Sequence, residues 1–452
     1  MGTNLGLLRL LWAIVSGAFL RSRGGVFPAL QWAGFSKEES RHSWQALRYG
    51  RWSINELIAR WRHYVRSEAA WQARTYAGYR ALALDLTTFW RPRLHGWLGR
   101  FFHRVANRLM KGVGVGVLVD VGQVGRQRVP LLKRLLRPSR PALTQAQFQG
   151  EMVQAVAQQM DRGEVLVHDA GLSLRALQEA GVARFVLRLA RNCTARRNQL
   201  ATPQGRGRPP QYGPRVRPLA RTYRGRHIDA TPPDFESRFA FEGRTIQVQG
   251  WQALVRADQK VAATHETFQI LVFHDPLYET PLVVGSNLTA APRTIFCLYL
   301  DRWPVEQVPL AAKQMLGLQR QFVFAPRSCW RLPALALLAG NILTYLAAVL
   351  PPLATGFWDR APKRTPGRLR RVLAQSDFPE SYPFDPRLRK KTSVSPTSPS
   401  DSARRIDDCS GIFRRCGNRC SSRRRRIAHG KRSHRLPRLR GRCRSIRRRS
   451  TR

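Results

Sequence analysis

Residues 81–89 read ALALDLTTF, and a second apolar stretch at residues 164–169 reads EVLVHD. Residues 81–84 and 164–168 within them are short apolar runs of the kind that forms a buried strand. Each of these runs is followed directly by an aspartate, Asp85 or Asp169. Further patterns predict a strand at 113–121 (VGVGVLVDV), helices at 145–160 and 172–180, and a strand at 185–189. The order strand, strand, helix, strand, helix, strand predicts an α/β fold, with a mixed sheet flanked by helices.

The rest of the chain divides into regions of different composition. Apolar residues at helical spacing, with arginines between them, predict an N-terminal helical region over 1–75 that either contacts DNA or only packs on the next domain. The α/β core is expected in two parts, 76–200 and 291–372. Between them, residues 201–290 begin as an arginine-rich linker and continue as a series of short β-like runs.

Residues 373–452 form an arginine-rich tail. Its segment 401–452 holds 20 basic residues against three aspartates and has no hydrophobic periodicity. Such a segment cannot bury enough surface to order itself, so a disordered tail is expected. It reads either as a nucleic-acid-binding tail or as the translation of a shifted reading frame. The spacing of its candidate zinc ligands is too short for a zinc finger; these are Cys416, Cys420, His429 and His434.

The whole chain is strongly basic. It has 78 Lys and Arg against 28 Asp and Glu, a formal net charge of +50. This charge predicts salt-dependent association with nucleic acid. It argues against an acidic scaffold, a secreted disulfide mini-protein or an ordinary metabolic enzyme. Seven widely spaced cysteines fit a reducing compartment, so a cytoplasmic, nucleoid-associated protein is expected.

Two apolar segments raise the question of a membrane. Residues 333–350 form an apolar run with one polar amide, Asn341, which is at the lower length limit for a membrane span. Because a sheet is predicted nearby, a buried helix packed on that sheet is the favoured interpretation. Residues 5–20 are interrupted by Arg9 and lack a basic leader, so an amphipathic helix is favoured over a targeting segment. No membrane partner is therefore expected.

Three carboxylates are the candidate chemical groups. Asp85 and Asp169 are expected at strand ends, where open α/β sheets present functional side chains. Glu306 is the candidate third carboxylate, carried by a helix that docks beside them. Three convergent carboxylates suit two Mg²⁺ ions, for which Mn²⁺ can substitute, because hard divalent cations prefer oxygen ligands. Such a pair of ions activates a water or 3′-hydroxyl and stabilises the leaving oxygen of a phosphodiester.

The residues around Glu306 form a pattern of their own. Tyr299, Arg302, Glu306 and Lys313 stand at offsets of 0, 3, 7 and 14. In one regular helix these offsets fall within roughly a 60° arc of a single face. Pro304 and Pro309 interrupt that segment, so the alternative is a helix that begins near Pro304 and leaves Tyr299 and Arg302 on a loop.

This spacing, Tyr-(2)-Arg-(3)-Glu-(6)-Lys, resembles the YREK signature of the DDE transposases of bacterial insertion sequences. The segments ALALDLTTFWRP around Asp85 and VLVHDAGLS around Asp169 resemble those that hold the two catalytic aspartates of that family. The resemblance covers roughly residues 40–375. It implies an RNase H-like fold with a β-rich insertion between the second aspartate and Glu306.

The resemblance also implies roles for single residues. Asp85, Asp169 and Glu306 would be catalytic metal ligands, Arg302 and Lys313 would contact DNA phosphates, and Tyr299 would help to position the DNA end. Asp120 competes with Asp85 as the first carboxylate. Asp85 is preferred, because the first strand supplies that residue in the implied fold. His168, next to Asp169, is expected to pack or to support it.

The predicted function is that of a DNA transposase, with metal-dependent cleavage at element ends and strand transfer into target DNA. The expected partner is double-stranded DNA, as terminal inverted repeats and as target, bound by a homodimer that assembles on it. The main alternative is a catalytically inactive insertion-sequence relic that acts only as a basic nucleic-acid-binding protein. A nuclease without strand transfer and a membrane-associated basic protein are the remaining alternatives.

Overall fold

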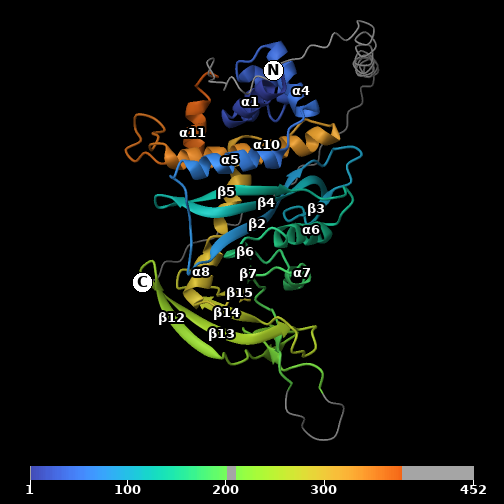
Figure 1. Cartoon of the computed structure of the whole chain (residues 1–452), viewed down its shortest axis with the longest axis vertical. Coiled ribbons are helices and arrows are strands. Elements are labelled where there is room, and N and C mark those ends of the chain that lie inside the picture. The colour runs from blue at the N-terminus through green and yellow to red at the C-terminus, as the bar shows by residue number, and fades with distance from the viewer. Residues whose placement is uncertain (1, 201–209, 379–452) are drawn as a thin grey trace, which may run out of the picture. The chain divides into compact units, whose positions relative to one another are not determined.

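The computed structural model describes residues 2–200 and 210–378, and its central element is one mixed β-sheet (Figure 1). The tail predicted at 373–452, with its cysteines and histidines, lies outside the described residues from residue 379 onward. The chain divides into two units, Met1–Pro383 and Phe384–Arg452.

The strand order of the first half of the sheet is β5-β4-β2-β6-β7. Strand β4 runs antiparallel to both of its neighbours, β2 and β5. Strand β6 runs parallel to β2, and β7 runs parallel to β6. The strands are β2 (Arg80–Trp90), β4 (Arg108–Val124), β5 (Gln127–Leu136), β6 (Glu164–His168) and β7 (Phe185–Arg188). Helix α6 (Gln145–Ala157) leads from β5 to β6, and helix α7 (Leu174–Glu179) leads from β6 to β7. The predicted mixed α/β sheet with flanking helices is confirmed.

The glycine-interleaved strand β4 explains how the two faces of the sheet differ. Its alternate valines, from Val113 to Val121, face one core, which they share with the N-terminal helices. Its glycines face the other core, where a Cβ on Gly114 would lie 2.2 Å from the Phe101 ring and one on Gly116 would lie 2.9 Å from Met152. The second core also holds the apolar residues of α6 and α7. The sheet is therefore covered by helices on both faces.

The second half of the sheet continues from β7 through β15, β14, β13, β8 and β9, with β12 paired to β13. The strands predicted between residues 239 and 284 are present. The region expected as a β-rich insertion is therefore hydrogen-bonded to the same sheet as the core. Its strands are β8 (Ala195–Arg197), β9 (Arg215–Val216), β12 (Phe235–Phe241), β13 (Arg244–Arg256), β14 (Phe268–His274) and β15 (Leu282–Ser286). Smaller strands are β1 (Gln72–Ala73), β3 (Arg100–His103), β10 (Arg221–Tyr223) and β11 (Arg226–Ile228).

Five helices form the N-terminal region, and three of them pack against a long helix from the C-terminal part of the unit (Figure 1). Helix α4 begins with a capping box, in which Ser36 and Glu39 bond each other's backbone N–H groups. The helices are α1 (Gly2–Val15), α2 (Ala18–Arg21), α3 (Val26–Trp32), α4 (Lys37–Tyr49) and α5 (Ile54–Ser67). Their apolar faces and the valine face of β4 belong to one core.

The long helix α10 (Pro326–Val349) contains most of the apolar run identified in the sequence. It packs on β5 and β4 on one side and on α1, α4 and α5 on another, so the predicted buried helix on a sheet is confirmed. It is the one helix in the described residues long and apolar enough to span a membrane, and 83% of its apolar window is buried. A short helix, α11 (Pro366–Leu373), packs on α10.

The polar residue of this run, Asn341, is fully buried and connects three elements. Its Oδ1 accepts hydrogen bonds from Trp61 Nε1 on α5 (3.0 Å) and from the Leu132 N–H on β5 (3.1 Å). Its Nδ2 donates to the Pro130 carbonyl (2.7 Å). The amide therefore fixes α10 on the edge of the sheet through bonds that an apolar residue could not make.

Candidate active site

Asp85 and Asp169 lie on neighbouring parallel strands. Ala83 of β2 pairs with Val167 of β6, and the two aspartates each follow two residues further along. The register therefore brings them to the same level of the sheet. The expectation that both stand at strand ends is correct for Asp169, which directly follows β6. It is wrong for Asp85, because β2 continues through Leu86 to Trp90 as the partner of β4.

The segment with the YREK-like spacing is helical but irregular. Tyr299 lies in the last turn of helix α8 (Pro292–Leu300), and a turn at Asp301 and Arg302 leads to the 3₁₀ helix η1 (Trp303–Glu306). The short helix α9 (Gln307–Leu310) and the π-helix η2 (Ala311–Met315) follow, and Lys313 lies in η2. The single helical face predicted from the spacing is therefore wrong, and so is the loop predicted for Tyr299. Neither proline has an N–H group to continue an α-helical ladder, and the helical type changes three times along this segment, from α to 3₁₀, back to α and then to π.

The turn between α8 and η1 is held by a buried acid, Asp301. Its carboxylate accepts a hydrogen bond from the Tyr76 hydroxyl (3.0 Å) and pairs with the Nε atoms of Arg74 and Arg128, each at 3.2 Å. Arg74 and Tyr76 closely follow the short strand β1, and Arg128 lies in β5. Three contacts to a fully buried carboxylate make the turn a fixed point, from which Arg302 and Glu306 extend.

Glu306 is paired with Arg302 of the same segment. The Arg302 Nη1 lies 2.9 Å from Glu306 Oε1, and the Arg302 side chain is 4% exposed while that of Glu306 is 49% exposed. The Arg302 guanidinium also lies 4.4 Å from the centre of the Trp303 ring. Burial lowers the pKa of Arg302, but the nearby Tyr299, Asp169 and Glu306 outweigh it and raise the pKa overall. Arg302 therefore sits between the second and third candidate carboxylates, and its contact with DNA stays a prediction.

Asp85 is the most perturbed of the carboxylates. Burial raises its pKa to about 6, and the negative charge of Glu306 adds to the rise. The Leu86 backbone and the positive charges of Arg302 and Lys313 act in the opposite direction. Among the described residues Asp85 has no ion-pair partner within 4 Å. Its charge is therefore largely uncompensated within the protein.

Lys313 approaches the site from η2. Its Nζ donates a hydrogen bond to Thr87 Oγ1 (2.6 Å), two residues beyond Asp85 on β2, and lies 5.2 Å from the centre of the Phe89 ring. Burial lowers the pKa of Lys313 to about 8, and the charge of Asp85 opposes the fall. Thr87 thus orients the ammonium group toward the strand that carries Asp85. No sequence pattern predicts this contact, because it depends on how η2 lies across β2.

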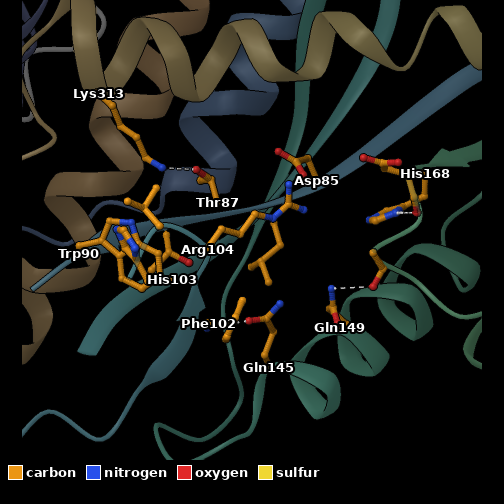
Figure 2. Close-up of a pocket in the computed structure, with 15 residues that line it drawn as sticks. Asp85, Thr87, Trp90, Phe102, His103, Arg104, Gln145, Gln149, His168 and Lys313 are labelled. Carbon is orange, nitrogen blue, oxygen red and sulfur yellow. Dashed lines mark hydrogen bonds between the residues drawn. The ribbon is translucent and has the colours of Figure 1, made fainter. Parts of the chain in front are cut away.

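Figure 2 shows the pocket onto which these residues open. It has a volume of about 390 Å³, and Asp85, Asp169 and Lys313 line one part of it. Trp90, Phe102 and His103 form an aromatic part, and Gln145 and Gln149 of α6 contribute amides. Glu306 does not line the pocket. The structure therefore brings two of the three predicted carboxylates to one cavity, with the third linked to them through Arg302.

His168 supports Asp169 through the backbone, as expected. Its Nδ1 lies 2.7 Å from the Asp169 carbonyl oxygen, so Nδ1 carries the proton and donates it. Burial lowers the pKa of His168 to about 4, so the ring is neutral at pH 7. Its Nε2 has no hydrogen-bond partner among the described residues, and the ring lines the pocket. The bond fixes the turn at which Asp169 leaves β6.

Asp120, the competing first carboxylate, has a different environment. It lies on β4, buried, and its Oδ2 pairs with Arg62 Nη2 (2.6 Å) and Arg66 Nη2 (2.9 Å) of α5. It does not line the pocket. These contacts give Asp120 a role in fastening α5 to the sheet, and Asp85 remains the preferred candidate.

The donor chemistry of the site fits a hard divalent cation, because Asp85 is a buried carboxylate without a counter-ion. No group of three or more His, Cys, Asp or Glu side chains within residues 2–200 and 210–378 is arranged to hold a metal ion. Arg302 forms an ion pair with Glu306, and Arg188 Nη1 lies 3.7 Å from Asp169 Oδ1. Asp169 and Glu306 are therefore each engaged by an arginine, whereas Asp85 is not engaged by any arginine of the described residues. Metal binding by Asp85, Asp169 and Glu306 stays a prediction.

No family model matches the chain, and the search of curated proteins returned no match either. The residues of the site and the charge of the chain are therefore the features that indicate its function.

Proposed function

We propose that the protein is a DNA transposase of the DDE type that cleaves the ends of an insertion sequence and transfers them into target DNA. The observation that carries this proposal is the pairing of Asp85 and Asp169 on adjacent parallel strands, with Glu306 close enough to raise the pKa of Asp85. The order β5-β4-β2-β6-β7 supports the RNase H-like fold that the sequence resemblance implies.

Asp85, Asp169 and Glu306 are the residues that would hold Mg²⁺ or Mn²⁺. When bound, these ions supply activation of a water or 3′-hydroxyl and stabilise the leaving oxygen. Lys313, oriented by Thr87 at the pocket, would bind a DNA phosphate beside Asp85. Arg302 would serve the same purpose once released from Glu306, and Tyr299 would help to position the DNA end. The partner is double-stranded DNA, bound by a homodimer in the cytoplasm.

The test uses a labelled duplex that carries the inverted repeats flanking the gene. With Mg²⁺ or Mn²⁺, the wild-type chain is expected to nick the repeat end and to join it to a target plasmid. Asp85→Asn, Asp169→Asn and Glu306→Gln are each expected to abolish nicking while DNA binding persists. The matched control is Asp229→Asn, whose side chain is 90% exposed. Unchanged cleavage by Glu306→Gln would reject the assigned site, and nicking without joining would assign a nuclease instead.

One observation favours a second candidate function, that of a basic DNA-binding protein without catalysis. Glu306 is held in an ion pair by Arg302, and no group of three carboxylates in the described part of the chain is arranged to hold a metal ion. Both features fit a protein that binds DNA without cleaving it. Salt-sensitive DNA binding with no metal-dependent cleavage by the wild-type chain would support this second function and exclude the first.

A further inference from the structure

A second pocket lies away from the carboxylates, where the N-termini of α5 and α10 meet the end of β5. It has a volume of about 390 Å³. Three arginines, Arg137, Arg327 and Arg331, and two tryptophans, Trp52 and Trp330, line it. No aspartate or glutamate is among the residues that line it. The chemistry of this pocket is therefore cationic and aromatic.

The positive charge in this pocket is not neutralised by the protein. Arg137 and Arg327 are exposed and form no ion pair or side-chain hydrogen bond within the described ranges. Arg331 donates to backbone carbonyls, including that of Leu47 at 2.9 Å, so its bonds fix its position without cancelling its charge. Burial lowers the pKa of Arg331, and the charge of Arg327 lowers it further. Like charges are thus held together at a pocket without an acid.

The N-terminus of α10 adds to this charge. Its N-cap residue, Ala325, makes no side-chain capping bond, whereas the first turn of α5 contains Glu56. The first turn of α10 has no acidic residue, and it holds Arg327 instead. A cation at the positive end of a 24-residue helix is unfavourable. An anion bound in the pocket would offset both the helix dipole and the arginines.

The aromatic walls are held in place. Trp52 donates its Nε1–H to the Ala46 carbonyl (2.8 Å), and the Arg331 guanidinium lies 4.4 Å from the centre of its ring. Trp330 packs 5.3 Å from Trp97, between ring centres. An inorganic anion would need only the arginines. Rigid rings beside the arginines suit a ligand that carries an aromatic base next to its phosphate.

We propose that this pocket binds a nucleoside phosphate, with the phosphate on Arg137 and Arg327 and the base against Trp330. The site is separate from the carboxylates and extends the proposed function. The same chemical unit can come from two sources, a free nucleotide or one nucleotide of a DNA strand. Both present a phosphate attached through a sugar to a planar base.

The test measures binding to the full chain by calorimetry and by tryptophan fluorescence. The probes are dAMP, deoxyadenosine, inorganic phosphate and a six-residue oligodeoxyadenylate. The proposal expects dAMP to bind more tightly than either deoxyadenosine or phosphate and to quench tryptophan emission. Arg137→Ala and Arg327→Ala should each weaken dAMP binding roughly tenfold, the effect of one charge-assisted hydrogen bond. Both residues are exposed, so these variants are expected to fold.

The matched control is Arg226→Ala, which removes an exposed arginine of β11. If it weakens dAMP binding as much as the two pocket variants do, binding reflects net charge and the proposal is overturned. Equal affinities for dAMP and inorganic phosphate would also overturn it. An oligonucleotide that binds more tightly than dAMP, and still needs Arg137 and Arg327, identifies DNA as the source, whereas equal affinities identify the free nucleotide. Asp85→Asn should bind dAMP normally, so failure of the carboxylate site and failure of this pocket give different results.

Discussion

Single residues of the site carry charges that the fold does not compensate. Asp85 is a carboxylate whose pKa is raised to about 6 because burial and Glu306 both disfavour its charged form. Arg302 and Lys313 reduce this effect without removing it. The folded protein at neutral pH therefore holds a costly negative charge beside a pocket. A bound cation would lower that cost.

The first prediction concerns the stability of Asp85→Asn. The folded protein binds the Asp85 proton more tightly than the unfolded chain, whose carboxyl has a pKa near the ordinary 3.8. The free energy of unfolding therefore falls as the pH rises from about 4 to about 6. At pH 7, the free energy of unfolding of Asp85→Asn should exceed that of wild type by up to about 3 kcal/mol, and this difference should vanish below pH 4.

Urea denaturation of both chains from pH 4 to pH 8 measures this difference, and Asp229→Asn is the exposed control. Comparison within one pH cancels the titration of other carboxylates. Equal stability of wild type and Asp85→Asn at pH 7 would contradict the assigned burial cost.

The second prediction concerns the Arg302–Glu306 ion pair. Because Arg302 holds Glu306 at 2.9 Å, Glu306→Gln should change the Mn²⁺ affinity of the DNA-free protein only slightly. Asp85→Asn should reduce that affinity at least about tenfold, the loss expected when a ligand of a metal site is removed. In an Arg302→Gln background Glu306 is free, so Glu306→Gln should then weaken Mn²⁺ binding too. Calorimetric titration of the wild type, the three single variants and the double variant tests this, and an equal effect of Glu306→Gln in both backgrounds contradicts it.

At the scale of elements, α10 shows why a polar residue interrupts an apolar run. The Asn341 amide satisfies the Trp61 indole, the Leu132 N–H and the Pro130 carbonyl, all of which are otherwise removed from water. Pro130 lies inside β5 and cannot donate to the sheet, so this part of the strand depends on side-chain partners. The helix and the edge strand therefore stabilise each other through one amide.

The third prediction follows from these bonds. Asn341→Leu should lower the free energy of unfolding by about 2–4 kcal/mol, because it leaves buried polar groups without partners. The control is Thr344→Val, since the Thr344 hydroxyl bonds only to the Gly340 carbonyl of its own helix. Thermal and urea unfolding measure both variants. A loss in Asn341→Leu no larger than that in Thr344→Val would show that the amide does not connect the elements as described.

The sequence predicted the elements with simple patterns and missed those with broken ones. The apolar runs of β2, β4, β6 and β7 were found, as was the buried helix. Strand β5 (QRVPLLKRLL) was missed because Pro130, Lys133 and Arg134 interrupt its pattern, whereas in the fold Lys133 pairs with the buried Glu164 at 2.7 Å. The helical face of the Tyr299–Lys313 segment failed because two prolines change the helical type along it.

The candidate site was predictable in its members but not in their contacts. The two aspartates follow from their apolar runs, and their adjacency follows once β2 and β6 are paired. The contacts of Arg302 with Glu306 and of Lys313 with Thr87 depend on the path of the irregular helices across the sheet. No local pattern specifies that path.

At the scale of the whole molecule, the net charge of +50 dominates any encounter with DNA. Residues 379–452 alone hold 24 of the 78 basic residues and five of the 28 acidic ones. A charge spread over so much of the chain contributes affinity without depending on the carboxylates. Binding and cleavage should therefore separate cleanly in experiments.

The fourth prediction is that Asp85→Asn binds duplex DNA as wild type does, with the same dependence on salt. The logarithm of the association constant should fall linearly with the logarithm of the salt concentration, with a slope of roughly −0.9 for each phosphate contacted. Fluorescence anisotropy between 50 and 400 mM salt, about the range in which such slopes are measured, tests this. A shallower slope in Asp85→Asn would mean that the carboxylate organises the DNA contacts rather than the chemistry.

The order of the chain has a consequence for how α10 comes to be covered. Of the described elements that pack on it, only α11 is encoded after it, and the others, α1, α4, α5, β4, β5, α9 and η2, are encoded before it. During synthesis this long apolar helix is therefore made after most of the elements that it contacts. A nascent chain that stops before residue 326 lacks α10, so the apolar surfaces that this helix covers stay exposed and can bind chaperones or neighbouring copies.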